Sequence, residues 1–396
     1  MQPENHQSQY RRFLGPAVVV GLILLDILVS SRLQPIMSLA PGATRSKTVP
    51  VALAAAAVAK DDELLKEAQT LFKPLPQDLA TAEFPINSDL VSLGRKLFFD
   101  PRISVDGTVS CARCHQPALY GTDGLEKSHG AHDKLLPRNA PTVLNAGMSF
   151  RQHWGGEFET VEEQAKRALL GAGFANPDYA AAMARVKAVP GYRELFKKAF
   201  PSEPDPVTAN NWAKAIGAYE RTLMTPSRFD VYLGGNTDAL TPTEQHGLRT
   251  FINTGCADCH RGAGIGGEQF RKFGVQEDYW NATGSKEIDK GRFELTKDPA
   301  DQYMFKVAGL RGVEMTPPYF HDGSVGTLSE AVRVMAIVQL GHEMSDQDAS
   351  AIVAFLKSLT GKLPQDFAIA PVLPSGGFGM PRPVSRAKKL LKETSR

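Results

Sequence analysis

Apolar and polar positions along most of the chain alternate at helical spacing. In residues 88–99 the apolar side chains Leu90, Leu93 and Leu97 recur on one face, and Ser88 is the expected N-cap. Further helices are predicted for residues 61–72, 161–170, 191–200 and 208–224. Strand-like alternation is scarce, so the pattern predicts a mainly α fold.

Two more helices are predicted near the C-terminus. Thr327, followed three residues later by Glu330, has the spacing of an N-terminal capping box, and Gly341 is the expected end of that helix. The next helix repeats the arrangement between Ser345 and Gly361.

The order "amphipathic helix, then Cys-x-x-Cys-His" occurs twice. The first cassette, SCARCHQPA, begins 17 residues after Gly94 with Cys111, and the second, GCADCHRG, places Cys256 nine residues after Gly247. This divergent repeat predicts two helical domains, which 396 residues suffice to build. The expected ranges are 1–60 (leader and linker), 61–235 (first domain), 236–365 (second domain) and 366–396 (flexible basic tail).

The N-terminal segment carries a further apolar run. Arg11 and Arg12 precede the stretch 13–29, which only Asp26 interrupts. Such a segment is an export signal or a short membrane anchor, and both interpretations stay open. The alanine-rich run 49–60 is either a cleavage region or a linker. In both cases the folded part is expected outside the cytoplasmic membrane, in the periplasm.

Charge is distributed unevenly. The formal net charge of +2 combines about +3 in residues 1–50, +5 in residues 382–396 and −6 between them. A mildly acidic body excludes a nucleic-acid surface and suits a small basic electron carrier.

Every cysteine falls in the two cassettes: Cys111 and Cys114 in the first, Cys256 and Cys259 in the second. In Cys-x-x-Cys-His both thiols can form thioethers to the vinyl groups of a haem, and the next imidazole, here His115 or His260, then becomes an axial ligand of the iron. A four-thiolate zinc site and a thioredoxin-like redox pair are the alternatives. Zinc would not need a histidine in register twice, and a redox pair favours a strand–helix setting that is missing here.

The cassettes and the strings around them resemble the bacterial di-haem cytochrome c peroxidases and their MauG-like relatives. The similarity extends from about residue 88 to 363 and includes PRNAPTVLNA, GYRELFKKAFP, TPPYFHDGS and IVAFLKSLTG. It implies two cytochrome c-like helical domains, each binding one covalent haem c.

The resemblance implies different roles for the two haems. Met335 in EAVRVMAIVQLG matches the methionine that closes the C-terminal haem, where MauG-like members have a tyrosine. Met304, Met315 and Met344 are weaker candidates for this ligand. A methionine ligand raises the reduction potential, so this haem is expected to store an electron.

The N-terminal haem is the one that meets peroxide in the family. A histidine of the loop before RNAPT caps its iron at rest, and here the loop offers His129 and His132, of which the pattern favours His132. Trp154 matches the tryptophan that relays electrons between the haems. Asn139, Thr316 and Pro318 match segments that share a calcium ion through oxygen donors.

One position departs from the family. Gln164 matches a distal glutamine, but Phe174 stands where a distal glutamate is expected ten residues later. Heterolysis of peroxide needs a group that moves a proton between its two oxygens. Glu157, Glu159 and Asp178 are the nearby substitutes, and none has the expected spacing.

The sequence therefore predicts a di-haem peroxidase that reduces hydrogen peroxide to water. Electrons would come from a c-type cytochrome or a cupredoxin, two per turnover, and a homodimer is compatible with this function. A MauG-like oxidase that modifies another protein and a non-catalytic di-haem electron-transfer cytochrome are the alternatives.

Overall fold

The structure, a computed structural model, describes residues 62–376 of the 396-residue chain, all within one compact unit. The predicted signal or anchor at 13–29, the run 49–60 and most of the predicted basic tail lie outside the described residues. No helix between residues 62 and 376 is long and apolar enough to cross a bilayer.

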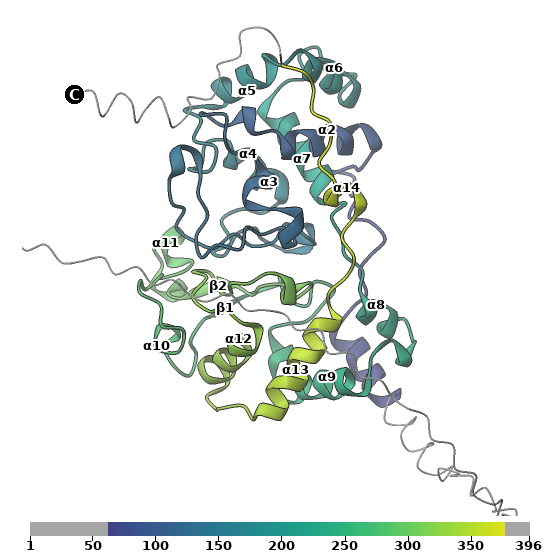
Figure 1. The fold of residues 1–396 in the computed structure, drawn as a ribbon, viewed down its shortest axis with the longest axis vertical. Helices are drawn as coiled ribbons and strands as arrows, with labels where there is room; N and C mark the ends of the chain where they lie inside the picture. The colour runs from purple at the N-terminus through teal and green to yellow at the C-terminus, as the bar shows by residue number, and fades with distance from the viewer. Residues whose placement is uncertain (1–61, 377–396) are drawn as a thin grey trace, which may run out of the picture. The chain divides into compact units, whose positions relative to one another are not determined.

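The described chain is mainly helical, as predicted, and its one sheet has two short antiparallel strands, in which Phe270 pairs with Lys306. Residues 62–71 are helical. The named helices up to the second cassette are α2 (Ser88–Phe99), α3 (Cys111–Cys114), α4 (Val161–Ala168), α5 (Tyr179–Lys187), α6 (Pro190–Ala199), α7 (Ala209–Glu220), α8 (Arg228–Leu233) and α9 (Pro242–Asn253). After it come β1 (Phe270–Lys272), α10 (Tyr279–Thr283), α11 (Phe293–Thr296), β2 (Met304–Lys306), α12 (Leu328–Met335), α13 (Asp346–Ser358) and α14 (Gln365–Ala368) (Figure 1).

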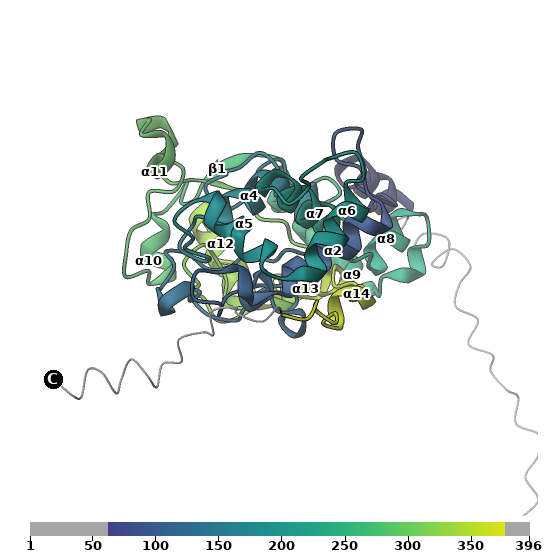
Figure 2. The same ribbon diagram turned by 90° about the horizontal axis from the view of Figure 1, so that it is seen from above.

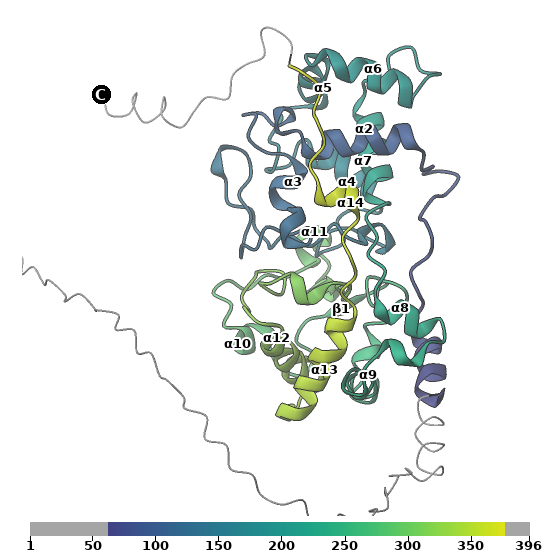
Figure 3. The same cartoon turned by 45° about the vertical axis from the view of Figure 1, so that its right-hand side comes forward.

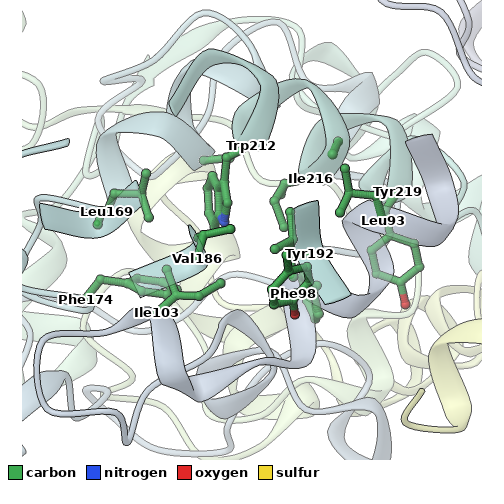
Figure 4. Packing of buried hydrophobic residues seen from close by; sticks show 14 of the residues in the cluster. Leu93, Phe98, Ile103, Leu169, Phe174, Val186, Tyr192, Trp212, Ile216 and Tyr219 are labelled. Atoms are coloured by element: carbon green, nitrogen blue, oxygen red, sulfur yellow. The ribbon is translucent and has the colours of Figure 1, made fainter. Parts of the chain in front are cut away.

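The first hydrophobic core lies where α2 crosses α7, beside α4 and α6 (Figure 2). Gly94 permits this crossing, because a Cβ there would lie 1.8 Å from the carbonyl oxygen of Ala215. Trp212, Tyr192, Phe98 and further large side chains fill the core around the crossing (Figure 4).

The second core repeats this construction with α9 and α13, which lie side by side (Figure 3). A Cβ on Gly247 would lie 1.9 Å from the carbonyl oxygen of Ala351 and 3.0 Å from the Cβ of Phe355. The glycine–helix crossing therefore occurs in both halves, and each crossing precedes its own cassette in the chain.

Both cores recruit segments from outside their predicted ranges. Leu64 and Phe72, predicted to belong to the first domain, are buried in the second core with Phe229. Phe367 of α14 is buried in the first core, so the flexible tail does not begin at residue 366 as predicted. Arg95 fixes α14 by donating to the carbonyl oxygens of Asp366 and Ile369, both at 2.7 Å.

The helix ends mostly follow the predicted capping signals. Thr327 and Ser345 cap α12 and α13, and Gly341 adopts the expected left-handed conformation with φ 74°. Two predictions were wrong. Asn87 rather than Ser88 caps α2, because its side chain accepts from the backbone N–H groups of the first turn. Gly361 lies beyond the end of α13 at Ser358 and packs tightly against the carbonyl oxygens of Thr225 and Pro226.

Candidate functional site

The first cassette forms one wall of a cavity of about 1180 Å³. Cys111 and Cys114 lie at the two ends of the single-turn helix α3, and His115 follows as its C-cap. The Nδ1 atom of His115 lies 3.0 Å from the carbonyl oxygen of Gly121. Burial lowers the pKa of His115, which keeps the imidazole neutral.

The second cassette forms a wall of another cavity, of about 510 Å³. Its Nδ1 contact is equivalent, since His260 lies 3.1 Å from the carbonyl oxygen of Ala308. Burial lowers the pKa of His260 to about 4.

Both histidines are thus in the form that a metal ligand requires. A carbonyl at Nδ1 selects the tautomer whose proton is on that nitrogen, which leaves the lone pair of Nε2 for a metal. Neutral imidazole is also the form that binds metals. The His260 cavity, of about 510 Å³, lies within the roughly 300–1,000 Å³ typical of ligand sites, and the His115 cavity, of about 1180 Å³, is larger.

The thiols fit thioether attachment better than either alternative. All four cysteines are free. Burial raises the pKa of Cys111 and Cys114, the opposite of what a redox-active thiolate pair needs. No group of three or more His, Cys, Asp or Glu side chains that could hold a metal ion occurs in residues 62–376, so the cysteines do not form a zinc cluster there. The residues present fit a covalent haem in each cavity.

The His115 cavity also contains the predicted distal residues. Gln164 on α4 lines it, and so does Phe174, which is buried and packs edge-on against Trp212 (Figure 4). Phe174 therefore belongs to the apolar core as well as to the cavity wall.

Of the three predicted substitutes for the missing acid, only Glu157 lines this cavity. Its carboxylate accepts from Arg138 at 2.9 Å. Glu159 is exposed and paired with Arg151, and Asp178 caps α5.

Glu220, at the end of α7, also lines the cavity and was not predicted as a site residue. Burial, assisted by the nearby Glu162 carboxylate, raises the pKa of Glu220 to about 8. The sequence did not indicate Glu220, because it lies in an ordinary amphipathic helix. The apolar pattern of such a helix is the same whether its buried face lines a cavity or packs in a core.

Neither candidate for the displaceable ligand lines the cavity in this structure. His132 has a positive φ of 57°, its side chain is 68% exposed, and its Nδ1 atom lies 3.8 Å from Asp106. His129 lies 3.0 Å from Asp133. The assignment of His132 as the resting ligand stays a prediction.

Met335 lines the His260 cavity from the end of α12. The helix continues there as a π-helical turn, Ala336–Leu340, a feature frequent at functional sites. Met344 lines the same cavity, whereas Met304 and Met315 do not.

Three aromatic side chains, His153, Trp154 and His321, line both cavities. Trp154 donates from Nε1 to the carbonyl oxygen of Asn139 at 3.0 Å. His321 is 2% exposed and packs on Phe305 at 4.5 Å between ring centroids. Its Nε2 atom makes no hydrogen bond within the described range, so a polar atom of a bound group could pair with it there.

The residues predicted to hold calcium lie near the same wall. Asn139 lines both cavities, and its backbone N–H donates to the carbonyl oxygen of His321 at 2.8 Å. Thr316 and Pro318 line the His260 cavity. The two predicted segments are thus joined, but their coordination of calcium stays a prediction.

Comparison with known proteins agrees with this geometry. The family model described as "Di-haem cytochrome c peroxidase" matches residues 88–238, and "Cytochrome c" matches residues 245–360. The cytochrome c551 peroxidase of Pseudomonas aeruginosa is 40% identical over 82% of this chain and 94% of its own length. This chain belongs to the di-haem cytochrome c peroxidase family. The predicted family, fold class and two haem c groups are confirmed.

Further relatives separate the two branches of this family. The cytochrome c551 peroxidase of Nitrosomonas europaea is 42% identical over 75% of this chain and 87% of its own length. The methylamine utilization protein MauG of Methylorubrum extorquens is 33% identical over 69% of this chain and 79% of its own length. A solved MauG-like protein associated with microbial copper homeostasis has a TM-score of 0.66 and 29% identity, with 76% of this chain and 96% of its own covered. The relatives named as peroxidases are more similar to this chain than the relative named MauG. This supports a peroxidase oxidoreductase, as predicted.

Proposed function

We propose that this di-haem cytochrome c peroxidase family member reduces hydrogen peroxide to water in the His115 cavity, with electrons that enter at the His260 cavity. The observation that supports this proposal most strongly is that two equivalent cassettes lie in cavities lined by different side chains. The His260 cavity contains Met335 and Met344, whereas Gln164, Phe174 and Glu220 line the His115 cavity. A thioether ligand favours electron storage, and a cavity without one favours binding of peroxide.

Haem c, when attached through the cassettes, supplies the redox-active iron. His115 and His260 would hold the two irons, and Met335 would be the second ligand in the His260 cavity. Gln164 orients peroxide through its side-chain amide. Trp154 relays electrons between the cavities, a role supported by its place on both walls.

The remaining assignments belong to the same proposal. His132 would bind the first iron at rest and leave on activation. Asn139, Thr316 and Pro318 would hold a calcium ion. The protein would be exported to the periplasm, receive electrons from a small cytochrome or cupredoxin, and have its domains divided near residue 235. A homodimer is compatible with these assignments.

The test is peroxide consumption by the purified di-haem protein with a reduced small cytochrome, before and after partial reduction. We expect turnover, at least after partial reduction. No turnover in either state, with both haems remaining low-spin, would instead support a plain electron-transfer cytochrome.

The MauG-like alternative rests on the absence of the expected carboxyl group at Phe174. It predicts that peroxide is consumed while a partner protein gains oxidised side chains, in the absence of any small electron donor. Mass spectrometry of candidate protein substrates separates this outcome from donor-dependent turnover.

A further inference from the structure

We propose that Glu220 is the proton-donating acid of the His115 cavity and replaces the carboxyl group that position 174 lacks. This inference rests on the peroxide reduction proposed above. Glu220 and Phe174 lie on different elements, α7 and the loop after α4, but both line one cavity with Gln164.

Glu220 is the acidic side chain that this cavity encloses most fully. It is 5% exposed, whereas the other acidic residues that line the cavity within residues 62–376 are all less than nine-tenths buried. Glu220 is therefore the acid that lies deepest in the wall of this cavity, which Gln164 and Phe174 also line.

The charges around Glu220 favour its neutral form. Arg221, the adjacent cation, donates to both carboxylate oxygens of Glu162 on α4, at 2.7 and 3.0 Å. Cys111 of α3 faces Glu220 from the cassette, and its thiol is neutral because burial raises its pKa. Burial outweighs the opposing effect of Arg221 and raises the pKa of Glu220 to about 8, which favours the protonated carboxyl group at pH 7.

Glu157, the competing acid, has a charged partner at one oxygen, while its Oε2 atom is buried without a hydrogen-bond partner among the described residues. Arg138 donates to the other oxygen at 2.9 Å and also binds Asp289 at 2.7 Å. Glu157 is thus held by an ion pair, whereas Glu220 forms no ion pair among the described residues.

The carboxylic acid of Glu220 gives its proton to the outer oxygen of hydrogen peroxide, the O–O bond breaks, and that oxygen leaves as water. The other oxygen keeps one hydrogen and becomes a second water when it takes up two electrons, from the haem irons, and one more proton from solvent. Solvent then reprotonates the Glu220 carboxylate. General acids of this type contribute about 10²–10⁴-fold to a rate.

The decisive variant is Glu220→Gln, which keeps the shape of the side chain and removes its acidity. In the di-haem protein, we expect the rate of peroxide cleavage to fall about 10²-fold or more, with unchanged haem content. The matched control is Glu159→Gln, an exposed carboxylate outside the cavity, which should retain the wild-type rate.

A second change tests whether the lost function is acidity. Phe174→Glu places a carboxyl group on the same cavity wall and should restore most of the rate when combined with Glu220→Gln. Infrared spectroscopy gives a readout independent of turnover: the C=O stretch of a protonated carboxylic acid should be present in the wild type at pH 7 and missing in Glu220→Gln.

The outcomes separate the two proposals. A wild-type protein that does not consume peroxide refutes the proposed function itself. A wild type that turns over, with Glu220→Gln equally fast or Glu157→Gln alone inactive, overturns only the role of Glu220. Loss of rate in Glu220→Gln without rescue by Phe174→Glu and without an infrared difference would also contradict it.

Discussion

At the scale of single residues, equivalent histidines are set in unequal surroundings. His115 and His260 each have a backbone carbonyl at Nδ1, from Gly121 and Ala308. The two cassettes therefore hold their histidines in the same way, whereas the side chains that line the two cavities differ. This difference is testable one residue at a time.

Met335 is expected to set the potential of the second haem. Met335→Leu removes the thioether but keeps an apolar side chain, so the midpoint potential of this haem should fall by on the order of 0.1 V, within the roughly 0.8 V range that axial ligands span. Met344→Leu is the matched control, because Met344 lines the same cavity. Spectroelectrochemical titration measures both. A lower potential in Met344→Leu alone would transfer the ligand role to Met344.

Glu220 should also make stability depend on pH. Its pKa is about 8 in the folded protein against an ordinary 4.5, so between these values the folded protein keeps a proton that the unfolded chain has released. Stability conferred by this proton falls as pH rises through the window. Glu220→Gln lacks this titration. The free energy of unfolding of the variant minus that of the wild type should therefore rise by about 1 kcal/mol or more between pH 5 and pH 8.

Urea denaturation at several pH values measures this difference. Glu159→Gln, whose carboxylate is exposed, should follow the wild type across the window. Parallel stability curves for wild type and Glu220→Gln would mean that Glu220 is not protonated in the folded protein.

The sequence indicated the cassettes by their own chemistry, and the family resemblance pointed to Gln164, Trp154 and Met335. All of these line the expected cavities, while their roles stay predictions. The sequence did not predict Glu220, because burial of that carboxyl depends on α7 packing against α4 and on Arg221 being engaged by Glu162. The position of the His132 side chain depends on a left-handed loop residue, which spacing does not show.

At the scale of secondary structure elements, the repeat reduces to two helix crossings with a glycine at each contact. Helical periodicity predicted α2, α9, α12 and α13 well, since each buries one apolar face. It did not indicate why Gly94 and Gly247 occur within helices. The structure explains both by backbone contact with α7 and α13.

Gly247→Ala should therefore destabilise the second core. The added methyl group would lie 1.9 Å from the carbonyl oxygen of Ala351, so α9 and α13 would have to separate. Overpacking of this kind costs typically about 1–3 kcal/mol. Gly326→Ala is the control, because a Cβ there has no neighbour within 4 Å. Equal stability of the two variants in urea would contradict the tight crossing.

At the scale of the whole molecule, chain segments from outside the predicted ranges complete the two cores. Phe72 packs in the second core and Phe367 in the first. A domain boundary read along the sequence misses both, because hydrophobic patterning shows that a helix needs a partner without showing which one. The two-haem architecture was predictable because each cassette contains its complete attachment chemistry.

The proposed function depends on two haems of unequal axial ligation that are attached to one chain. A reduced-minus-oxidised potentiometric titration of the matured protein, with haem quantified as its pyridine haemochrome, tests it most directly. We predict two covalent haems per chain and two well-separated midpoints, the higher one lost in Met335→Leu. A single haem, or two haems that titrate together at one potential, would contradict this account.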